Sequence, residues 1–424
     1  MEIVKTYGSI LKSIAPKHPK AAFSMIRTGL SLECFRTKHL ADKRMPLAYQ
    51  KLNTLGMELS IKALKHPEQC VWTNLFTPTE LFQCFDLNCL SIEFLASYIS
   101  GFQCEDYFID FAEQQGLAPA LCSYHKTFIG TIDSGVIPPA GFASTTSMIC
   151  DGNINTFRYI CDKYHINQFM LDVPTEYSPE AVQYLTEQLK ELTAILEART
   201  GKKMDFDRLR EIIDRENKSL ALYREFLALQ TKKNYPTTMT LSMFMLLATH
   251  LCIGSPEIYD FFLTMRQEIE AYPDFDGLRI LWVHLFPFYQ ETLKEYFNYS
   301  DKYLLQTTEM HFDYMEELDT ARPLETLARK LICNVYNAPY RKKAELVEKL
   351  AKEYRSDAVI NFCHWGCKQS SGGVMLLREQ MQKAGIPLLV LEGDAMDRRG
   401  SFDGQIRTRL EAFLEMVEQS KGVC

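Results

Sequence analysis

The stretch Asp357–Arg399, DAVINFCHWGCKQSSGGVMLLREQMQKAGIPLLVLEGDAMDRR, contains a complete unit of alternating structure. Ala358–Phe362 is a short apolar run of strand type, and Ser370–Ala384 carries apolar residues on one helical face. A second strand-type run, IPLLVLEG, ends in an acidic loop. Cys363 and Cys367 lie in the turn between the first strand and the helix. Because ligands of open parallel sheets bind at the carboxyl ends of the strands, we expect the chemistry at this turn.

The same alternation occurs further upstream. Strand-type runs at Asn88–Leu90, Ala143–Met148 and Gln168–Val173 alternate with helical patterns, as is typical of a parallel sheet. After a long helical stretch, strand-type runs return at LRILWVHLF from Leu278 and at Tyr303–Leu305. The sequence therefore predicts an α/β protein with two Rossmann- or flavodoxin-like parallel-sheet domains that face each other across a cleft.

Four segments follow from these patterns. We predict a helical N-terminal extension at 1–68, a first α/β domain at 69–177, a helical insertion at 178–274 and a second α/β domain at 275–424. Ser178-Pro179 marks the start of the insertion, because serine caps helices and proline favours the first helical position.

Composition limits the possible classes of protein. The net charge of −7 argues against nucleic-acid binding, which needs clustered Lys and Arg. The start of the chain lacks the pattern of a secretory signal, so we expect a cytoplasmic protein. The longest apolar run, Met239–Ile253, is too short to span a membrane and is expected to be a buried helix. Thirteen cysteines in a cytoplasmic chain are expected to be reduced thiols, so metal or redox chemistry has to be considered.

Three cysteines lie at turns of one type. Cys150 and Cys367 each follow a strand and precede a helix, and Cys122 precedes a segment closed by a glycine. Helix N-termini favour thiolates, which suits such cysteines to bind iron. By spacing alone the signal is weak, and packed core thiols are the plainer interpretation. Cys363 and Cys367 could form half of a zinc site, but no second pair of suitable spacing accompanies them.

The motifs around these cysteines carry a resemblance. HWGCKQSSGG, IPLLVLEGD and DGQIRTRLEAFLE occur in this order, preceded by LCSYHKTFIG at Leu121–Gly130 and TTSMICDGNINTF at Thr145–Phe157. In order and spacing they resemble the 2-hydroxyacyl-CoA dehydratase and benzoyl-CoA reductase family, from about Val71 to the C-terminus.

The resemblance implies a cofactor and partners. Cys122, Cys150 and Cys367 would bind one [4Fe-4S] cluster, with Cys363 left as a packed core thiol. Three thiolates leave one iron open to a substrate oxygen. The resemblance also implies a related second subunit, forming a heterodimer, and an ATP-dependent iron–sulfur activator protein. This chain contains no G-x-x-x-x-G-K-[ST] segment of its own for nucleotide hydrolysis.

Further site residues are carried over by position. Glu93 matches the family's carboxylate near the cluster and is the expected catalytic acid or base, although a solvated helix residue is the alternative. Thr73 and Asn74 match a hydroxyl-rich turn of catalytic residues. Some members have a serine where this chain has Leu75, which is a departure from that pattern.

The turn after Cys367 is a candidate for binding the CoA substrate. Ser370, Ser371, Gly372 and Gly373 open a predicted helix whose N–H groups suit the CoA diphosphate. The signal is weak without the resemblance.

Nearby residues complete the predicted site. Gly393-Asp394 and Arg398 are expected to shape the same pocket, with a surface ion pair as the plainer interpretation. His125 and His364 are candidates to donate to the cluster sulfurs, with satisfied core histidines as the alternative.

The predicted function is dehydration of an (R)-2-hydroxyacyl-CoA to a 2-enoyl-CoA. In the family one low-potential electron converts the thioester to a ketyl radical, which expels the 2-hydroxyl group. The alternatives are an ATP-dependent reductase of the benzoyl-CoA reductase or double-cubane type, a non-catalytic electron-relay subunit and a cluster-free binding protein.

Overall fold

The computed structural model describes residues 2–422 and contains two four-stranded sheets in which the paired strands run parallel. The first sheet has the order β2-β1-β3-β4 and the second has the order β6-β5-β7-β8. Their strands are β1 Cys70–Thr73, β2 Asn88–Ser91, β3 Phe142–Thr146, β4 Gln168–Leu171, β5 Leu278–Val283, β6 Tyr303–Thr308, β7 Ala358–His364 and β8 Leu388–Gly393. The prediction of two parallel-sheet domains is confirmed, and both sheets follow the same strand order.

Helices connect the strands within each half. Those of the first half are α4 Thr79–Cys84, α5 Ile92–Gly101, α6 Glu105–Gln114, α7 Ser123–Asp133 and α8 Asp151–Tyr164. Those of the second half are α13 Glu291–Phe297, α14 Pro323–Ile332, α15 Tyr340–Glu353, α16 Lys368–Ser371, α17 Val374–Ala384 and α18 Asp403–Lys421.

The strand order defines one crevice in each sheet. Connections leave β1 and β3 in opposite directions, and they leave β5 and β7 in opposite directions as well. In such sheets the carboxyl ends of these two strands form the usual ligand site. The segment after β3 contains Cys150 and the segment after β7 contains Cys367, so the two cysteines occupy equivalent positions in the two halves.

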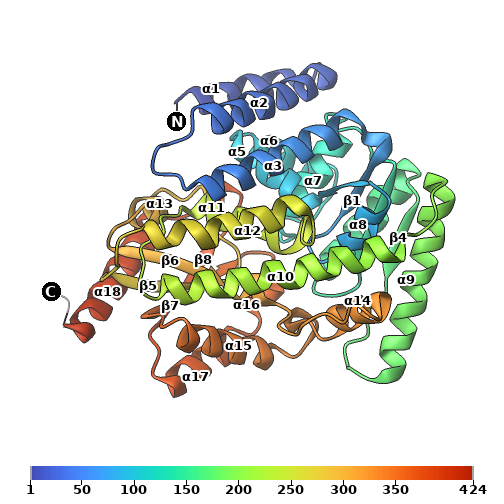
Figure 1. Ribbon diagram of the computed structural model, residues 1–424. Helices are drawn as coiled ribbons and strands as arrows, with labels where there is room; N and C mark the ends of the chain where they lie inside the picture. The colour runs from blue at the N-terminus through green and yellow to red at the C-terminus, as the bar shows by residue number, and fades with distance from the viewer. Residues whose placement is uncertain (1, 423–424) are drawn as a thin grey trace.

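The remaining helices surround the sheets. The N-terminal helices are α1 Glu2–Ile14, α2 Pro19–His39 and α3 Leu47–Lys65, and the inserted helices are α9 Pro179–Thr200, α10 Phe206–Gln230, α11 Met239–Leu246 and α12 Pro256–Glu268. In Figure 1, α9 and α18 lie at opposite sides of the molecule and α10 crosses the front between them. Ser178 and Asp205 cap α9 and α10 with their side chains, as expected for these residue types. The boundaries between the four predicted segments stay predictions.

Several elements differ from the sequence-based expectation. The helix predicted at Ser370–Ala384 is two helices, α16 and α17, interrupted at Gly372 and Gly373. The apolar run from Met239 is helical as predicted, but a π-helical turn at Leu247–Leu251 interrupts its second half. Short 3-10 turns connect other elements, at Pro67–Gln69, Ile269–Ala271, Glu309–Phe312, Val335–Asn337 and Arg398–Gly400.

A continuous apolar core joins the segments. It includes Leu11 of α1, Trp72 of β1, Phe226 of α10 and Val359 of β7, all at most 2% exposed. Because burial of such side chains is the main stabilising term, the N-terminal and inserted helices stabilise the same core as the sheets. Within residues 2–422, no helix combines the length and apolar character that a membrane span requires.

Candidate functional site

The three predicted cluster ligands occupy the same structural position. Cys122, Cys150 and Cys367 are the N-cap residues of α7, α8 and α16, and none of them caps its helix through the side chain. Their sulfur atoms are therefore not used to cap these helices. Burial raises the pKa of Cys122 well above its usual value, and it raises that of Cys150 as well. A bound metal would reverse this preference, because it favours thiolates as ligands.

These cysteines also lie near one another. After burial, the charge of Cys367 is the next cause that raises the pKa of Cys122, and Cys150 adds to it. The charge of Cys367 likewise raises the pKa of Cys150. The backbone shows the contact directly, because a Cβ atom on Gly366 would lie 2.7 Å from the Cα and N atoms of Cys122. The structure thus brings the cysteine turns of the two halves together.

Each of the three sulfur atoms has a histidine neighbour. His364 Nε2 lies 3.1 Å from Cys122 Sγ, and His125 Nε2 lies 3.8 Å from Cys150 Sγ. These two histidines were candidates from the sequence. His284 was missed, although its Nε2 lies 3.3 Å from Cys367 Sγ. The signal for His284 was its position in the strand-type run from Leu278, directly after the last residue of β5. Asn74 has the equivalent position after β1 in the first sheet.

The donor set fits an iron–sulfur cluster. In a cubane each thiolate binds a separate iron, so the sulfur atoms surround the cluster rather than converge on a single ion. Residues 2–422 contain no group of three or more His, Cys, Asp or Glu side chains arranged around one ion. Three N-cap thiols, each with an imidazole nitrogen beside its sulfur, provide the ligands and the hydrogen-bonding neighbours that such clusters use.

Cys363 has a different environment. It is 7% exposed within β7, where its sulfur accepts a hydrogen bond from Asn361 Nδ2 at 3.2 Å and donates to the Ser370 carbonyl oxygen at 3.5 Å. These contacts agree with a packed core thiol.

Glu93 lies in the first turn of α5, with Ser91 as the N-cap residue. The Ser91 hydroxyl donates to Glu93 Oε2 and accepts from the backbone N–H of Glu93 at 3.2 Å. Burial raises the pKa of Glu93, whereas the bond from Ser91 and the charge of His250 lower it. The Glu93 charge also raises the pKa of Cys150, so the carboxyl group lies within electrostatic range of a candidate ligand.

Thr73 and Asn74 lie at the carboxyl end of β1. Thr73 pairs with Ser91 of β2 and Ser144 of β3, and its buried Oγ1 has no hydrogen-bond partner. Asn74 is hydrogen-bonded at both ends of its amide, because its Oδ1 accepts from Thr77 at 2.6 Å and its Nδ2 donates to a neighbouring threonine at 3.5 Å. Thr73 therefore retains hydrogen-bonding capacity, whereas Asn74 shapes the turn.

Most backbone N–H groups of the predicted CoA-binding turn already donate to nearby backbone carbonyl groups. The N–H groups of Ser370 and Ser371 donate to the Cys367 carbonyl at 3.3 Å, and that of Gly372 donates to the Lys368 carbonyl at 2.8 Å. The helix begins earlier than predicted, directly after Cys367. Ser370 is buried, so contact with CoA through this turn stays a prediction for the exposed Ser371 and Gly372.

The loop after β8 supports the cysteine turns. Asp394 Oδ1 accepts from the Ser123 hydroxyl at 2.7 Å, which links this loop to the residue after Cys122. Arg398 donates to Glu105 Oε1 at 2.6 Å, and because Glu105 is buried this is not the surface ion pair of the plainer interpretation.

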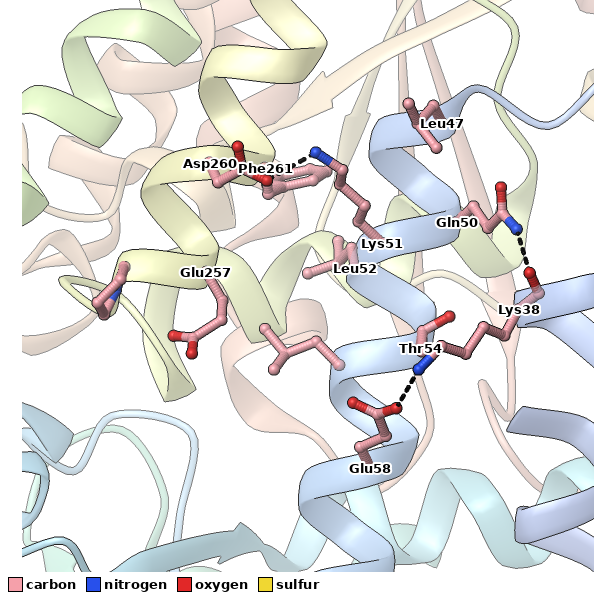
Figure 2. A pocket seen from close by; sticks show the side chains of 12 residues that line it. Lys38, Leu47, Gln50, Lys51, Leu52, Thr54, Glu58, Glu257, Asp260 and Phe261 are labelled. Atoms are coloured by element: carbon pink, nitrogen blue, oxygen red, sulfur yellow. Dashed lines mark hydrogen bonds and ion pairs between the residues drawn. The ribbon is translucent and has the colours of Figure 1, made fainter. Parts of the chain in front are cut away.

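A surface groove lies between α3 and α12 and has a volume of about 540 Å³. Figure 2 shows two pairs of charged side chains in this groove, Lys51 with Asp260 and Lys38 with Glu58, whose ion-pair distances are 2.7 and 3.2 Å. The residues lining this groove include none of the predicted site residues.

Fold and site together define an α/β protein of two similar halves that places three cysteines at helix N-termini. A family model described as 2-hydroxyglutaryl-CoA dehydratase, D-component, matches residues 74–417. The chain therefore belongs to this family, which confirms the predicted resemblance.

Individual relatives have low sequence identity to this chain but match it over most of its length. The chain is 23% identical to the (R)-2-hydroxyisocaproyl-CoA dehydratase alpha subunit of Clostridioides difficile, over 87% of this chain and 96% of that protein. It is 22% identical to the (R)-phenyllactyl-CoA dehydratase alpha subunit of Clostridium sporogenes, over 91% and 98%. It is 24% identical to a benzoyl-CoA reductase subunit of Thauera aromatica, over 73% and 79%.

Proposed function

We propose that this chain is a subunit of an oxygen-sensitive [4Fe-4S] dehydratase that converts an (R)-2-hydroxyacyl-CoA to the 2-enoyl-CoA. The observation that carries the proposal is the approach of three N-cap cysteines from both halves, with the Glu93 carboxyl group near one of them. Relatives named as 2-hydroxyacyl-CoA dehydratase alpha subunits support the substrate class.

Cys122, Cys150 and Cys367 would bind the cluster. When bound, it supplies one low-potential electron and an iron with an open position for a substrate oxygen. The helix N-termini favour the thiolate state that these ligands need.

Glu93 would move the proton. Dehydration requires removal of a β-proton from the substrate, and a carboxylate with a raised pKa is a stronger base than an ordinary one. The free hydroxyl of Thr73, in register with Ser91 at the start of α5, would hydrogen-bond the substrate on the same side.

We further propose that the chain works in the cytoplasm with a related second subunit and an ATP-dependent activator protein. The names of the two dehydratase relatives, each an alpha subunit, support a multi-subunit enzyme.

Iron content after anaerobic reconstitution tests the ligand assignment. We expect about four irons per chain in the wild type, and loss of cluster absorbance in Cys122→Ser, Cys150→Ser and Cys367→Ser. Cys363→Ser is the matched control, because it changes a cysteine of the same segment that has other contacts. Full iron in Cys367→Ser together with loss in Cys363→Ser would reject the assignment.

A net reductase is the second candidate, since a benzoyl-CoA reductase subunit is a relative of similar identity. A dehydratase returns its electron and reuses it over many turnovers, whereas a reductase consumes two electrons per product. The amount of reductant consumed per product after activation therefore separates them. A constant requirement for two electrons per product would favour the reductase.

A further inference from the structure

Each candidate cluster ligand has its own histidine. The pairs are His364 with Cys122 at 3.1 Å, His284 with Cys367 at 3.3 Å and His125 with Cys150 at 3.8 Å, measured from Nε2 to Sγ. We propose that the three histidines donate their Nε2–H groups to the three thiolates and thereby raise the potential at which the cluster is reduced. This inference rests on the proposed function, because it requires the cysteines to bind the cluster.

The position of the proton on His364 follows from its second nitrogen. The backbone N–H of Ala395 donates to His364 Nδ1 at 3.0 Å, so Nδ1 is an acceptor and carries no proton. An imidazole ring carries at least one proton, which therefore lies on Nε2 and points to Cys122 Sγ. The loop between β8 and α18 thus selects the His364 tautomer whose Nε2–H group donates to the Cys122 sulfur.

His284 is held by a buried ion pair. Its backbone has a φ of +74°, which a non-glycine residue rarely adopts. Its N–H group donates to both Glu309 carboxylate oxygens, at 3.2 and 3.0 Å. Glu309 in turn bonds Lys343 at 3.0 Å and the Tyr336 hydroxyl at 2.6 Å, with both charged side chains at most 1% exposed. A strained backbone kept by so many contacts indicates a positional requirement, here the ring beside Cys367.

His125 makes the weakest of the three contacts. Its Nε2 is 3.8 Å from Cys150 Sγ, and its Nδ1 is buried without a partner, as is Nδ1 of His284. A thiolate offers only an acceptor, so donation from Nε2 is the arrangement that both rings can satisfy. The distances therefore rank the expected effects, with His364 first, His284 second and His125 third.

The direction of the effect follows from charge. Reduction adds one electron, supplied by a low-potential one-electron donor protein, and the negative charge is shared with the thiolate sulfurs. Hydrogen bonds to these sulfurs stabilise the reduced state more than the oxidised state. Loss of one donor should make the cluster harder to reduce.

Matched substitutions test the donors on the full chain after anaerobic reconstitution. His→Met at each position replaces the ring and its N–H group by an apolar side chain of similar length. His→Gln retains an amide N–H near the Nε2 position. The readout is the midpoint potential from a redox titration followed by electron paramagnetic resonance, which does not depend on substrate turnover. We expect His364→Met to lower the equilibrium constant for cluster reduction by about tenfold, which lowers the midpoint potential by roughly 59 mV for one electron. We expect a smaller shift for His125→Met and values near wild type for the Gln variants.

His311→Met is the control for changing a buried histidine. His311 is 3% exposed and bonds Tyr223 and Thr307 at 3.0 Å, so its loss should leave the potential unchanged. A wild-type chain that takes up no cluster would reject the proposed function before any variant is made.

The histidine proposal fails separately from the proposed function. Met variants that load the cluster and titrate at the wild-type potential would overturn it, as would Gln variants that shift as far as the Met variants. If a Met variant does not retain the cluster, proton couplings of the reduced wild-type cluster decide the question. Exchangeable protons coupled to the cluster support donation, and their absence would overturn the proposal.

Discussion

Glu93 is under opposing influences. Burial favours its neutral form, whereas the hydroxyl of Ser91 and the charge of His250 favour the carboxylate. If Glu93 removes the substrate proton, Glu93→Gln should lower turnover by about 10²- to 10⁴-fold with unchanged iron content. The measurement is steady-state turnover of an accepted acyl-CoA together with iron analysis. Unchanged turnover would instead favour a non-catalytic electron-relay subunit.

Ser91 offers a finer test at the same position. Removing its hydrogen bond in Ser91→Ala should raise the pKa of Glu93 further, since that bond lowers it. A base acts in its ionised form, so the acid limb of the pH–rate profile should move to higher pH. Ser91→Ala also removes a helix cap worth about 1 kcal/mol. Ser178→Ala removes a comparable cap from α9 and is the control, for which the pH–rate profile should not move.

At the scale of elements, the glycine turn before α16 determines how closely the cysteine turns approach. Gly366 has a φ of +80°, and a side chain there would meet the Cys122 backbone at 2.7 Å. Gly385 has a similar φ of +69° but open space around the missing side chain. Both Gly→Ala variants should lose about 1 kcal/mol from backbone strain, which lowers the melting temperature.

Only Gly366→Ala should in addition lose iron after reconstitution, because it separates Cys367 from Cys122. Equal iron content in the two variants would show that this close contact is not needed for cluster binding.

Most strand positions were predictable from the sequence because buried parallel strands form continuous apolar runs, although the short strand β1 was not among the predicted runs. Cys150 and Cys367 follow such runs, whereas Cys122 follows a helix and was singled out by the resemblance of the motif around it. His284 was missed because a lone histidine carries no spacing signal, and its role depends on Glu309, which follows another strand. The interruption at Gly372 and Gly373 was visible in the sequence, but the apolar spacing from Val374 onward masked it. Gly373 is required there because a side chain would overlap the Tyr340 ring.

At the scale of the whole molecule, one half-buried lysine joins both halves to the insertion. Lys330 of α14 lies 2.8 Å from Glu80 of α4 and 2.6 Å from Glu216 of α10. Both carboxyl groups are at most 2% exposed. One positive charge balances one carboxylate, so the second carboxyl group is stable in its neutral form. Burial is the main cause that raises the pKa of Glu216 to about 8.

This pKa makes the stability of the assembled chain depend on pH. The folded chain keeps a proton on Glu216 up to about pH 8, whereas the unfolded chain releases it near the ordinary value of 4.5. Folding therefore binds a proton in this interval, and stability should fall as pH rises through it, by at most about 1.4 kcal/mol per pH unit. Glu216→Gln mimics the protonated form and should remove the fall in stability that Glu216 causes as pH rises. The melting temperature of this variant should therefore exceed that of the wild type by a margin that grows from about pH 5 to 8. Glu211→Gln, which changes an exposed carboxylate on the same helix, should leave the pH dependence unchanged. A difference between Glu216→Gln and wild type that stays constant with pH would show that Glu216 is ionised in the folded chain throughout this range.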